Sequence, residues 1–90
     1  MKRRQLLEQM KRLLSNRFGL GLRPDEIPDS SAIFGSGLGL DSMAAIELVV
    51  ALEKEFGLTV LDEDLTEANF RSVAALASYV QRRMEGGLDS

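Results

Sequence analysis

The chain lacks cysteine and histidine throughout its 90 residues. Without cysteine it forms neither disulfide bonds nor thiolate metal sites, and without histidine we expect no zinc site or other metal centre. A nucleophilic serine needs a general base, which histidine most often provides. We therefore expect no self-contained serine catalysis, and the question becomes what another enzyme attaches to this chain.

Long apolar runs are also missing. The basic start at residues 1–4 resembles the first part of a signal peptide, but Glu8, Lys11 and Arg12 interrupt the apolar residues that follow. No apolar run is long enough to cross a bilayer. We expect a cytoplasmic protein without stable membrane insertion.

Charge is unevenly distributed, although the net charge is only −3. Residues 1–23 carry seven basic side chains against Glu8 alone, whereas residues 24–70 carry eleven acidic side chains against Lys54 alone. Such an acidic region can attract a basic partner surface, and the alternative is a solvated face without a partner. We expect no nucleic acid among the partners.

Helical periodicity dominates the rest of the pattern. Apolar residues recur at intervals of three and four within residues 3–18, 42–56 and 72–84, which predicts three main helices. Shorter helical turns are predicted at 62–67 and near 25–27. No strand-type alternation persists, so we expect an all-α fold, a small bundle of three main helices plus one short helix.

A long connection separates the first two predicted helices. Residues 19–41 are rich in glycine and proline, and a connection of this length in a compact domain is either functional or disordered. Five apolar residues favour a loop pinned across the helix ends: Ile27, Ile33, Phe34, Leu38 and Leu40. We expect one domain over residues 1–85 and a flexible tail at 86–90, where two glycines occur.

The second predicted helix has more apolar residues than one buried stripe needs. One set can face the core, namely Leu48, Val49, Leu52 and Phe56. Another falls on a different face, namely Met43, Ile46 and Val50. This second face either presents a surface to a partner or extends the core, and we favour the partner.

Ser42 stands where the glycine-rich loop gives way to this helix. Asp41 is a suitable N-cap, and the start of a helix offers free N–H groups and a positive dipole end that favour a phosphate. Asp41 is too weakly basic to activate an alcohol. The glycine-rich segment before Ser42 is not a P-loop, because no lysine ends it and no strand precedes it. With self-activation and a P-loop both disfavoured, we interpret Ser42 as a serine that another enzyme modifies.

At this point the residues match a known family. Residues 39–43, Gly-Leu-Asp-Ser-Met, are followed by Ile-Glu-Leu-Val at 46–49 and by Leu-Glu-x-Glu-Phe at 52–56, and this pattern resembles the acyl carrier proteins. The resemblance implies that Ser42 carries 4′-phosphopantetheine, installed from coenzyme A by a magnesium-requiring phosphopantetheinyl transferase. The terminal thiol of that arm would hold acyl intermediates as thioesters. The protein itself would not be an enzyme.

The resemblance also implies further site residues. Partner recognition would use side chains on and around the second helix: Asp41, Met43, Ile46, Glu47, Val50, Glu53, Asp62 and Glu63. An acyl chain could shelter among apolar side chains between the helices: Phe34, Leu48, Leu52, Phe56, Val60 and Leu76. The expected partners are the transferase and enzymes of the acyl-transferring and ketosynthase types, which a monomeric carrier would visit in fatty acid, polyketide-like or related lipid biosynthesis.

Some residues depart from the pattern typical of fatty acid synthesis. Ala44 and Lys54 stand where acidic residues are frequent, and Ser36 and Gly37 replace a typically acidic pair. These departures favour a specialised carrier for a polyketide-like, aryl-polyene-like or envelope-lipid pathway. A peptidyl carrier is less favoured, because its serine usually follows a histidine whereas Ser42 follows Asp41. The alternatives from other classes are a cofactor-free helical interaction module and a membrane-surface protein that uses its basic first helix.

Overall fold

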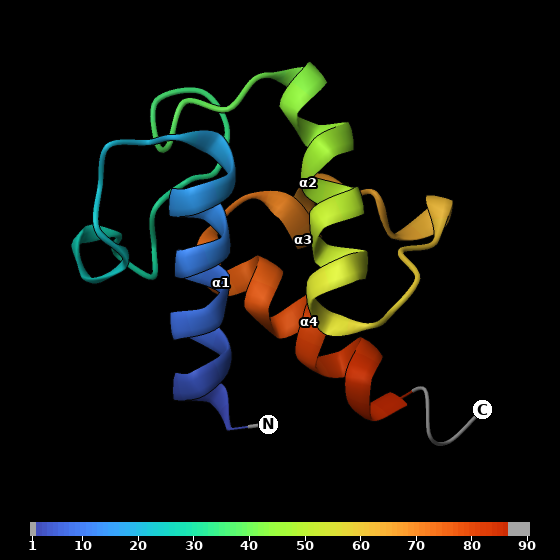
Figure 1. The fold of residues 1–90 in the computed structure, drawn as a ribbon. Coiled ribbons are helices and arrows are strands. Elements are labelled where there is room, and N and C mark those ends of the chain that lie inside the picture. The colour runs from blue at the N-terminus through green and yellow to red at the C-terminus, as the bar shows by residue number, and fades with distance from the viewer. Residues whose placement is uncertain (1, 87–90) are drawn as a thin grey trace.

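The structure of the chain, a computed structural model, describes residues 2–86. Its elements follow one another as α1 (Arg3–Phe18), the 3₁₀ turn η1 (Pro24–Glu26), α2 (Ser42–Phe56), the 3₁₀ turn η2 (Asp62–Asp64), α3 (Glu67–Phe70) and α4 (Val73–Gly86) (Figure 1). The described residues form three long helices and one short helix. This confirms the predicted all-α class.

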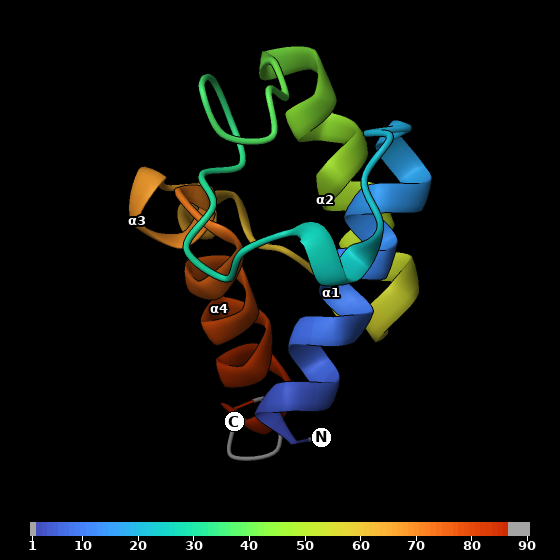
Figure 2. The same cartoon turned by 90° about the vertical axis from the view of Figure 1, so that its left-hand side faces the viewer.

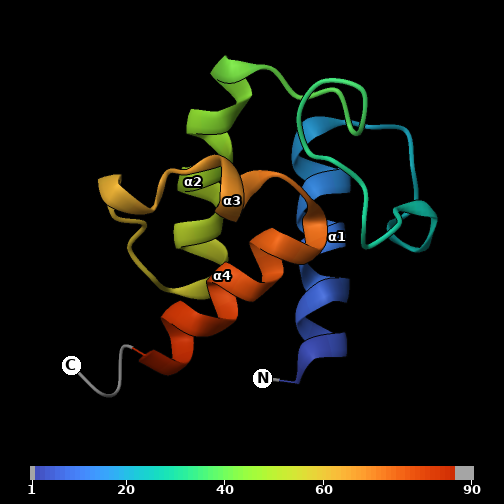
Figure 3. The ribbon, with the colours of Figure 1, turned by 180° about the vertical axis from the view of Figure 1, so that it is seen from behind.

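Helices α1 and α2 lie side by side and run in opposite directions (Figure 1). Helix α4 packs against α1 and runs diagonally past the pair, and it carries α3 on its surface (Figure 3). The start of α2 lies at the end of the molecule opposite the start of α1 (Figures 1 and 2). The end of the long loop and the first turn of α2 are therefore grouped at one end of the bundle.

The core forms where the apolar stripes of α1, α2 and α4 meet. Side chains spaced by about one helical turn are buried in each helix, since 3.6 residues per turn place them on one face. They include Leu6, Met10 and Leu14 in α1, Leu48, Leu52 and Phe56 in α2, and Val73, Leu76 and Val80 in α4. Burial of one such aliphatic side chain contributes roughly 1.5–3 kcal/mol.

The centre of the apolar stripe of α1 lies in the core, and Leu7, Leu13 and Phe18 beside it are partly buried. Leu6, Met10 and Leu14 are fully buried, so the apolar face that a membrane-lying helix would need is in the core. Among residues 2–86, no helix has the length and hydropathy needed to span a bilayer. Some basic side chains of α1 bond within the fold as well, since Arg3 donates to the Ser78 hydroxyl at 2.9 Å.

The long loop is ordered against the bundle, as its apolar residues predicted. Ile27, Ile33 and Leu40 are buried, and the other two anchors are partly buried. The main chain of the loop also bonds to the first turn of α4, where Val73 N–H donates to the Ser31 carbonyl at 3.0 Å. The predicted turn near residues 25–27 is confirmed as η1.

The predicted short helix at 62–67 is split in two. Residues Asp62–Asp64 form the 3₁₀ turn, Leu65 leaves helical geometry with φ −79° and ψ 71°, and a new helix starts at Glu67. The Thr66 hydroxyl caps that helix by accepting from Asn69 N–H at 3.3 Å. Acidic residues that favour a helix start explain the first turn, and the threonine cap explains why a second one follows.

Helix α4 begins after Ser72, whose hydroxyl caps it by accepting from Ala75 N–H at 3.1 Å. Its expected end was at Met84, and the helix continues to Gly86. Four residues of the predicted tail, 87–90, lie outside the described residues. The domain boundary after residue 85 stays a prediction.

Tyr79 on α4 fastens the segment that precedes α3. Its hydroxyl donates to a carboxylate oxygen of Asp64 at 2.8 Å, and the residue is only 3% exposed. Burial and, second, the hydrogen bond to the Asp64 carboxylate raise the pKa of Tyr79 from 10.0 to about 12. Ionisation of this phenol is therefore opposed by the folded state.

We expect the stability of the protein to decrease above pH 10 because of Tyr79. The raised pKa stabilises the fold while the phenol is protonated, and this contribution is lost as the pH rises from 10 through about 12. Tyr79 is the only tyrosine and tryptophan is absent, so the ultraviolet absorbance of the phenolate reports this group directly. A midpoint near 10 in protein that circular dichroism shows to be folded would contradict the assignment.

Candidate functional site

The first turn of α2 is capped by Asp41. This residue has extended backbone geometry, and its carboxylate accepts a hydrogen bond from Ala44 N–H at 2.9 Å. Its carbonyl accepts from Ala45 N–H at 3.3 Å. Asp41 is therefore the N-cap that the sequence predicted, and Ser42 is the first residue of the helix with its side chain exposed.

The loop before Ser42 is closed by hydrogen bonds of its main chain. Leu40 N–H donates to the Ile33 carbonyl at 3.2 Å, and Gly35 N–H donates to the Leu40 carbonyl at 3.4 Å. The Leu40 side chain is buried in the core. Leu40 is thus held both by main-chain hydrogen bonds and by its buried side chain. Because Leu40 lies two residues before Ser42, the start of α2 has a defined position at this end of the bundle.

The surroundings of Ser42 fit a covalently bound phosphate. The first N–H groups of an α-helix have no intrahelical acceptor and lie at the positive end of its dipole. The Asp41 carboxylate, the nearest acid in sequence, is turned toward the helix by its bond to Ala44 N–H.

Within residues 2–86, no group of three or more histidine, cysteine, aspartate or glutamate side chains is arranged to hold a metal ion.

Three apolar residues predicted for partner contact are exposed on α2. Met43 is 81% exposed and Ile46 is 72% exposed, while Val50 is exposed to a smaller extent. Large apolar side chains that are exposed on the helix beginning at Ser42 are suited to contact with another protein. The structure thus brings these three residues and Ser42 onto the same helix.

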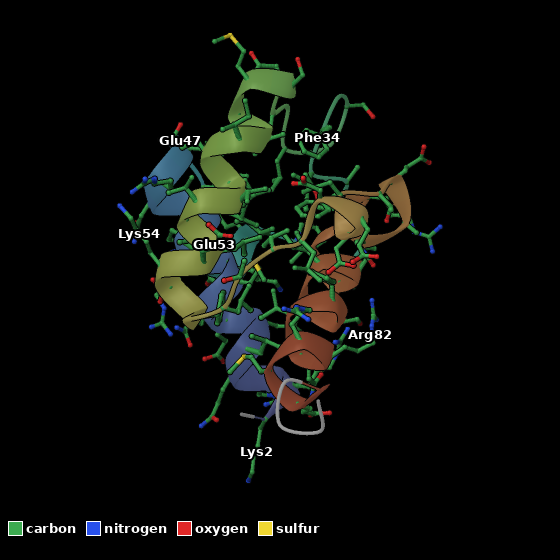
Figure 4. All side chains as sticks on the ribbon, turned by 90° about the vertical axis from the view of Figure 1, so that its right-hand side faces the viewer. Lys2, Phe34, Glu47, Glu53, Lys54 and Arg82 are labelled. Atoms are coloured by element: carbon green, nitrogen blue, oxygen red, sulfur yellow. The ribbon has the colours of Figure 1, made fainter. Side chains whose placement is uncertain are left out.

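The acidic residues predicted for recognition have different environments. Glu47 forms an ion pair with Arg17 of α1 at 3.4 Å, and it lies on the α1 side of α2 together with Lys54 (Figure 4). Glu53 accepts a hydrogen bond from Val60 N–H at 2.9 Å. This bond ties the end of α2 to the following connection. The two acids predicted for recognition in η2, Asp62 and Glu63, are exposed.

An apolar pocket of about 380 Å³ opens between α2 and α3. Phe34 of the long loop contributes to it and lies on the side of α2 away from Glu47 (Figure 4). The volume is near the lower limit for ligand sites. The pocket is lined by Phe34, Ala45, Ile46, Val49, Leu65, Thr66, Glu67, Phe70 and Arg71.

Of the six residues predicted to shelter an acyl chain, only Phe34 lines this pocket. The others are packed in the core, with Leu48, Leu52 and Leu76 fully buried and Phe56 and Val60 nearly so. The physical reason is the direction of the helix face, since Ala45 and Val49 face α3 whereas Leu48 and Leu52 face the core. Spacings of three, four and seven residues from Ser42 could have indicated Ala45, Ile46 and Val49. The residues contributed by the α3 segment depend on tertiary packing.

Comparison with known proteins agrees with this geometry. Residues 8–80 match the family model described as "Phosphopantetheine attachment site". The chain is 39% identical to an acyl carrier protein of Bdellovibrio bacteriovorus over 64 residues, which are 71% of this chain and 78% of that protein. It is 33% identical to an acyl carrier protein of Phytoplasma australiense, covering 88% of this chain and 97% of the relative.

Other similarities extend to structure and to a larger enzyme. A solution structure of a holo acyl carrier protein from Nitrosomonas europaea superposes with a TM-score of 0.79 at 31% identity, covering 90% of this chain and 98% of that one. A non-reducing polyketide synthase of Stachybotrys bisbyi is 41% identical over 62% of this chain, but that match is only 2% of the synthase. The family consists of carriers rather than catalysts, and its members interact with a phosphopantetheinyl transferase and with synthase-type enzymes. The chain belongs to the acyl carrier protein family and carries acyl groups on covalently attached 4′-phosphopantetheine.

Proposed function

We propose that Ser42 is the residue to which 4′-phosphopantetheine is attached. The observation that supports this most directly is the position of its exposed hydroxyl at the first residue of α2, next to the Asp41 cap. The bound group supplies the thiol that holds an acyl chain as a thioester, and this chain has no cysteine of its own. The residues of α2 present that arm to partner enzymes.

The pocket between α2 and α3 is our proposed shelter for the acyl chain. Its walls come from apolar side chains such as Ala45, Val49 and Phe70, and polar groups occur only where Thr66, Glu67 and Arg71 contribute. Transfer of each methylene from water into such a site is favourable by about 0.8 kcal/mol.

We also propose that the carrier serves a dedicated cytoplasmic pathway of the polyketide-like, aryl-polyene-like or envelope-lipid type. The ion pair of Arg17 with Glu47 and the exposed Lys54 reduce the negative field on the α1 side of α2. Similarity to part of a polyketide synthase supports the polyketide-like option. Its enzymes would be of the acyl-transferring and ketosynthase types, visited by the carrier as a monomer.

Loading of the unmodified wild-type chain tests the attachment site. The protein is incubated with coenzyme A, Mg²⁺ and a broad-specificity phosphopantetheinyl transferase, and its intact mass is measured. We expect one added phosphopantetheine per chain, located on Ser42 by fragmentation of the modified peptide. Attachment at another residue would refute the proposed site, and no attachment would favour the cofactor-free interaction module.

Arg17 should act as an internal competitor for basic partner residues that approach Glu47. Exposed ion pairs contribute roughly 0.2–1 kcal/mol, so we expect Arg17→Gln to raise the kcat/KM of loading by up to about fivefold at low salt. Glu47→Gln should lower it by a similar factor. Both effects should decrease as salt screens the charges.

The double variant is the control for this prediction. In the Glu47→Gln background, Arg17→Gln should have no further effect on the loading rate, because the acid that Arg17 neutralises is absent. Initial rates are measured with the same transferase over a range of salt concentrations. An equal gain in both backgrounds would show that Arg17 acts through some other contact.

A further inference from the structure

The two walls of the pocket differ in how they are supported. Helix α2 supplies one wall through Ala45 and Val49, and the neighbouring Leu48 and Leu52 secure that helix in the core. The opposite wall comes from the segment 65–71, which contains the four-residue helix α3. A helix this short has almost no stability of its own, so its position depends on what holds it from outside.

A cluster of polar contacts holds this second wall on α4. Tyr79 donates to a carboxylate oxygen of Asp64 at 2.8 Å. Asn69 donates to the Asp64 carbonyl at 2.9 Å, and a guanidinium nitrogen of Arg82 donates to the Asn69 side-chain oxygen at 3.0 Å. We call these four residues the clamp. Two of them, Tyr79 and Arg82, belong to α4, and Figure 4 shows Arg82 on that helix.

Phe70 connects the clamp to the pocket. It lines the pocket, it is only 7% exposed, and its ring packs on the Tyr79 ring with centroids 6.1 Å apart and planes inclined by 40°. Tyr79 does not line the pocket itself. A change in the position of the Tyr79 hydroxyl or ring therefore reaches the pocket through Phe70 and through the segment that starts at Asp64.

We propose that the clamp sets the width of the pocket between α2 and α3, and with it the length of acyl chain that the carrier shelters. In this role Tyr79 is a positioning residue that determines cargo length without touching the cargo. The proposal rests on the proposed function, because it takes Ser42 as the attachment residue and the pocket as the site of the chain. It adds the part of the fold that discriminates among chains.

Removal of one clamp hydrogen bond should shift the wall toward displaced positions. The net contribution of a hydrogen bond corresponds to about a fivefold change in such an equilibrium. A looser wall should protect short chains less and admit longer ones. The expected signature is a changed dependence on chain length, which general loss of stability does not produce.

The experiment uses the holo protein loaded with saturated acyl chains of increasing length. Two quantities are measured for each form: the rise in Tm over the unacylated holo protein, and the rate at which an external thiol removes the acyl group. For the wild type we expect protection to increase with chain length and then level off. Tyr79→Phe and Asp64→Ala should move that plateau to longer chains and make exchange of short chains about fivefold faster.

Two further variants separate positioning from stability. Asp64→Asn keeps an acceptor for the Tyr79 hydroxyl and should keep the wild-type plateau. Leu14→Val removes a methylene from the core on α1 and should lower Tm for all forms equally, again with the wild-type plateau.

The outcomes distinguish the two proposals. If Tyr79→Phe shows the wild-type plateau, like Leu14→Val, the clamp does not set the width and the inference is overturned while Ser42 and the pocket stand. If the wild type gains nothing at any chain length, the pocket assignment and the inference both fail. A chain that cannot be loaded at Ser42 refutes the proposed function itself, and this inference with it.

Discussion

Ser42→Ala is expected to abolish loading with phosphopantetheine completely. The substitution removes the hydroxyl oxygen that would form the phosphodiester, and no neighbouring side chain can replace it, because Asp41 and Met43 have no nucleophile of that kind. The measurement is intact mass after incubation with coenzyme A, Mg²⁺ and the transferase. Any residual phosphopantetheine on this variant would disprove the assignment.

The fold of the variant should stay intact, which makes the result interpretable. The cap of α2 comes from Asp41, so loss of the Ser42 hydroxyl should change the free energy of unfolding by less than about 0.5 kcal/mol. Ser36→Ala is the matched control, since Ser36 is also exposed and lies in the loop before α2. It should be loaded as the wild type is. If Ser42→Ala instead lowers the free energy of unfolding strongly, its lost loading would be explained by misfolding.

Gly37→Ala should destabilise the protein more than alanine at either Gly35 or Gly39 in the same loop. A Cβ atom at this position would lie 1.9 Å from the Ala32 carbonyl oxygen, which itself accepts a hydrogen bond from Leu38 N–H at 2.8 Å. The backbone must move and that bond must break. Together with disturbed packing of Leu38 and Leu40, we expect a loss of about 2–4 kcal/mol.

Gly35→Ala, two residues before Gly37 in the same loop, is the comparison for the loss of stability. Gly35 has a φ of +66°, and no atom lies within 4 Å of the position that a Cβ would take, so the cost is backbone strain alone, about 1–2 kcal/mol. Unfolding in urea measures both losses. Gly37→Ala should also slow loading at Ser42 below its melting transition, because the loop positions the first turn of α2. Equal destabilisation by the two alanines would argue against the close approach.

Local patterns were sufficient to predict the parts of this protein that depend on near neighbours in sequence. The three long helices follow from apolar spacing, and the start of α2 at Ser42 follows from the Asp41 cap. For the helices and the cap the deciding pattern spans a few residues. The apolar residues of the long loop predicted that it packs on the bundle, and Ile33 and Leu40 are buried.

Contacts between distant segments explain what the sequence did not predict. The pocket needs α2 beside the segment 65–71, and the Tyr79 hydroxyl of α4 donates to Asp64 immediately before that segment. The pairing of Glu47 with Arg17 likewise joins two helices whose relative rotation no local pattern specifies.

The sequence by itself determined the helices, the capped serine and the family, because periodicity, capping and a short motif are local. Only the tertiary structure decided which face of α2 borders the pocket, which of its acids bond within the fold, and what holds α3 in place. A helical pattern shows that a residue lies on an apolar face. The packing of other helices determines whether that face borders the core, a pocket or solvent.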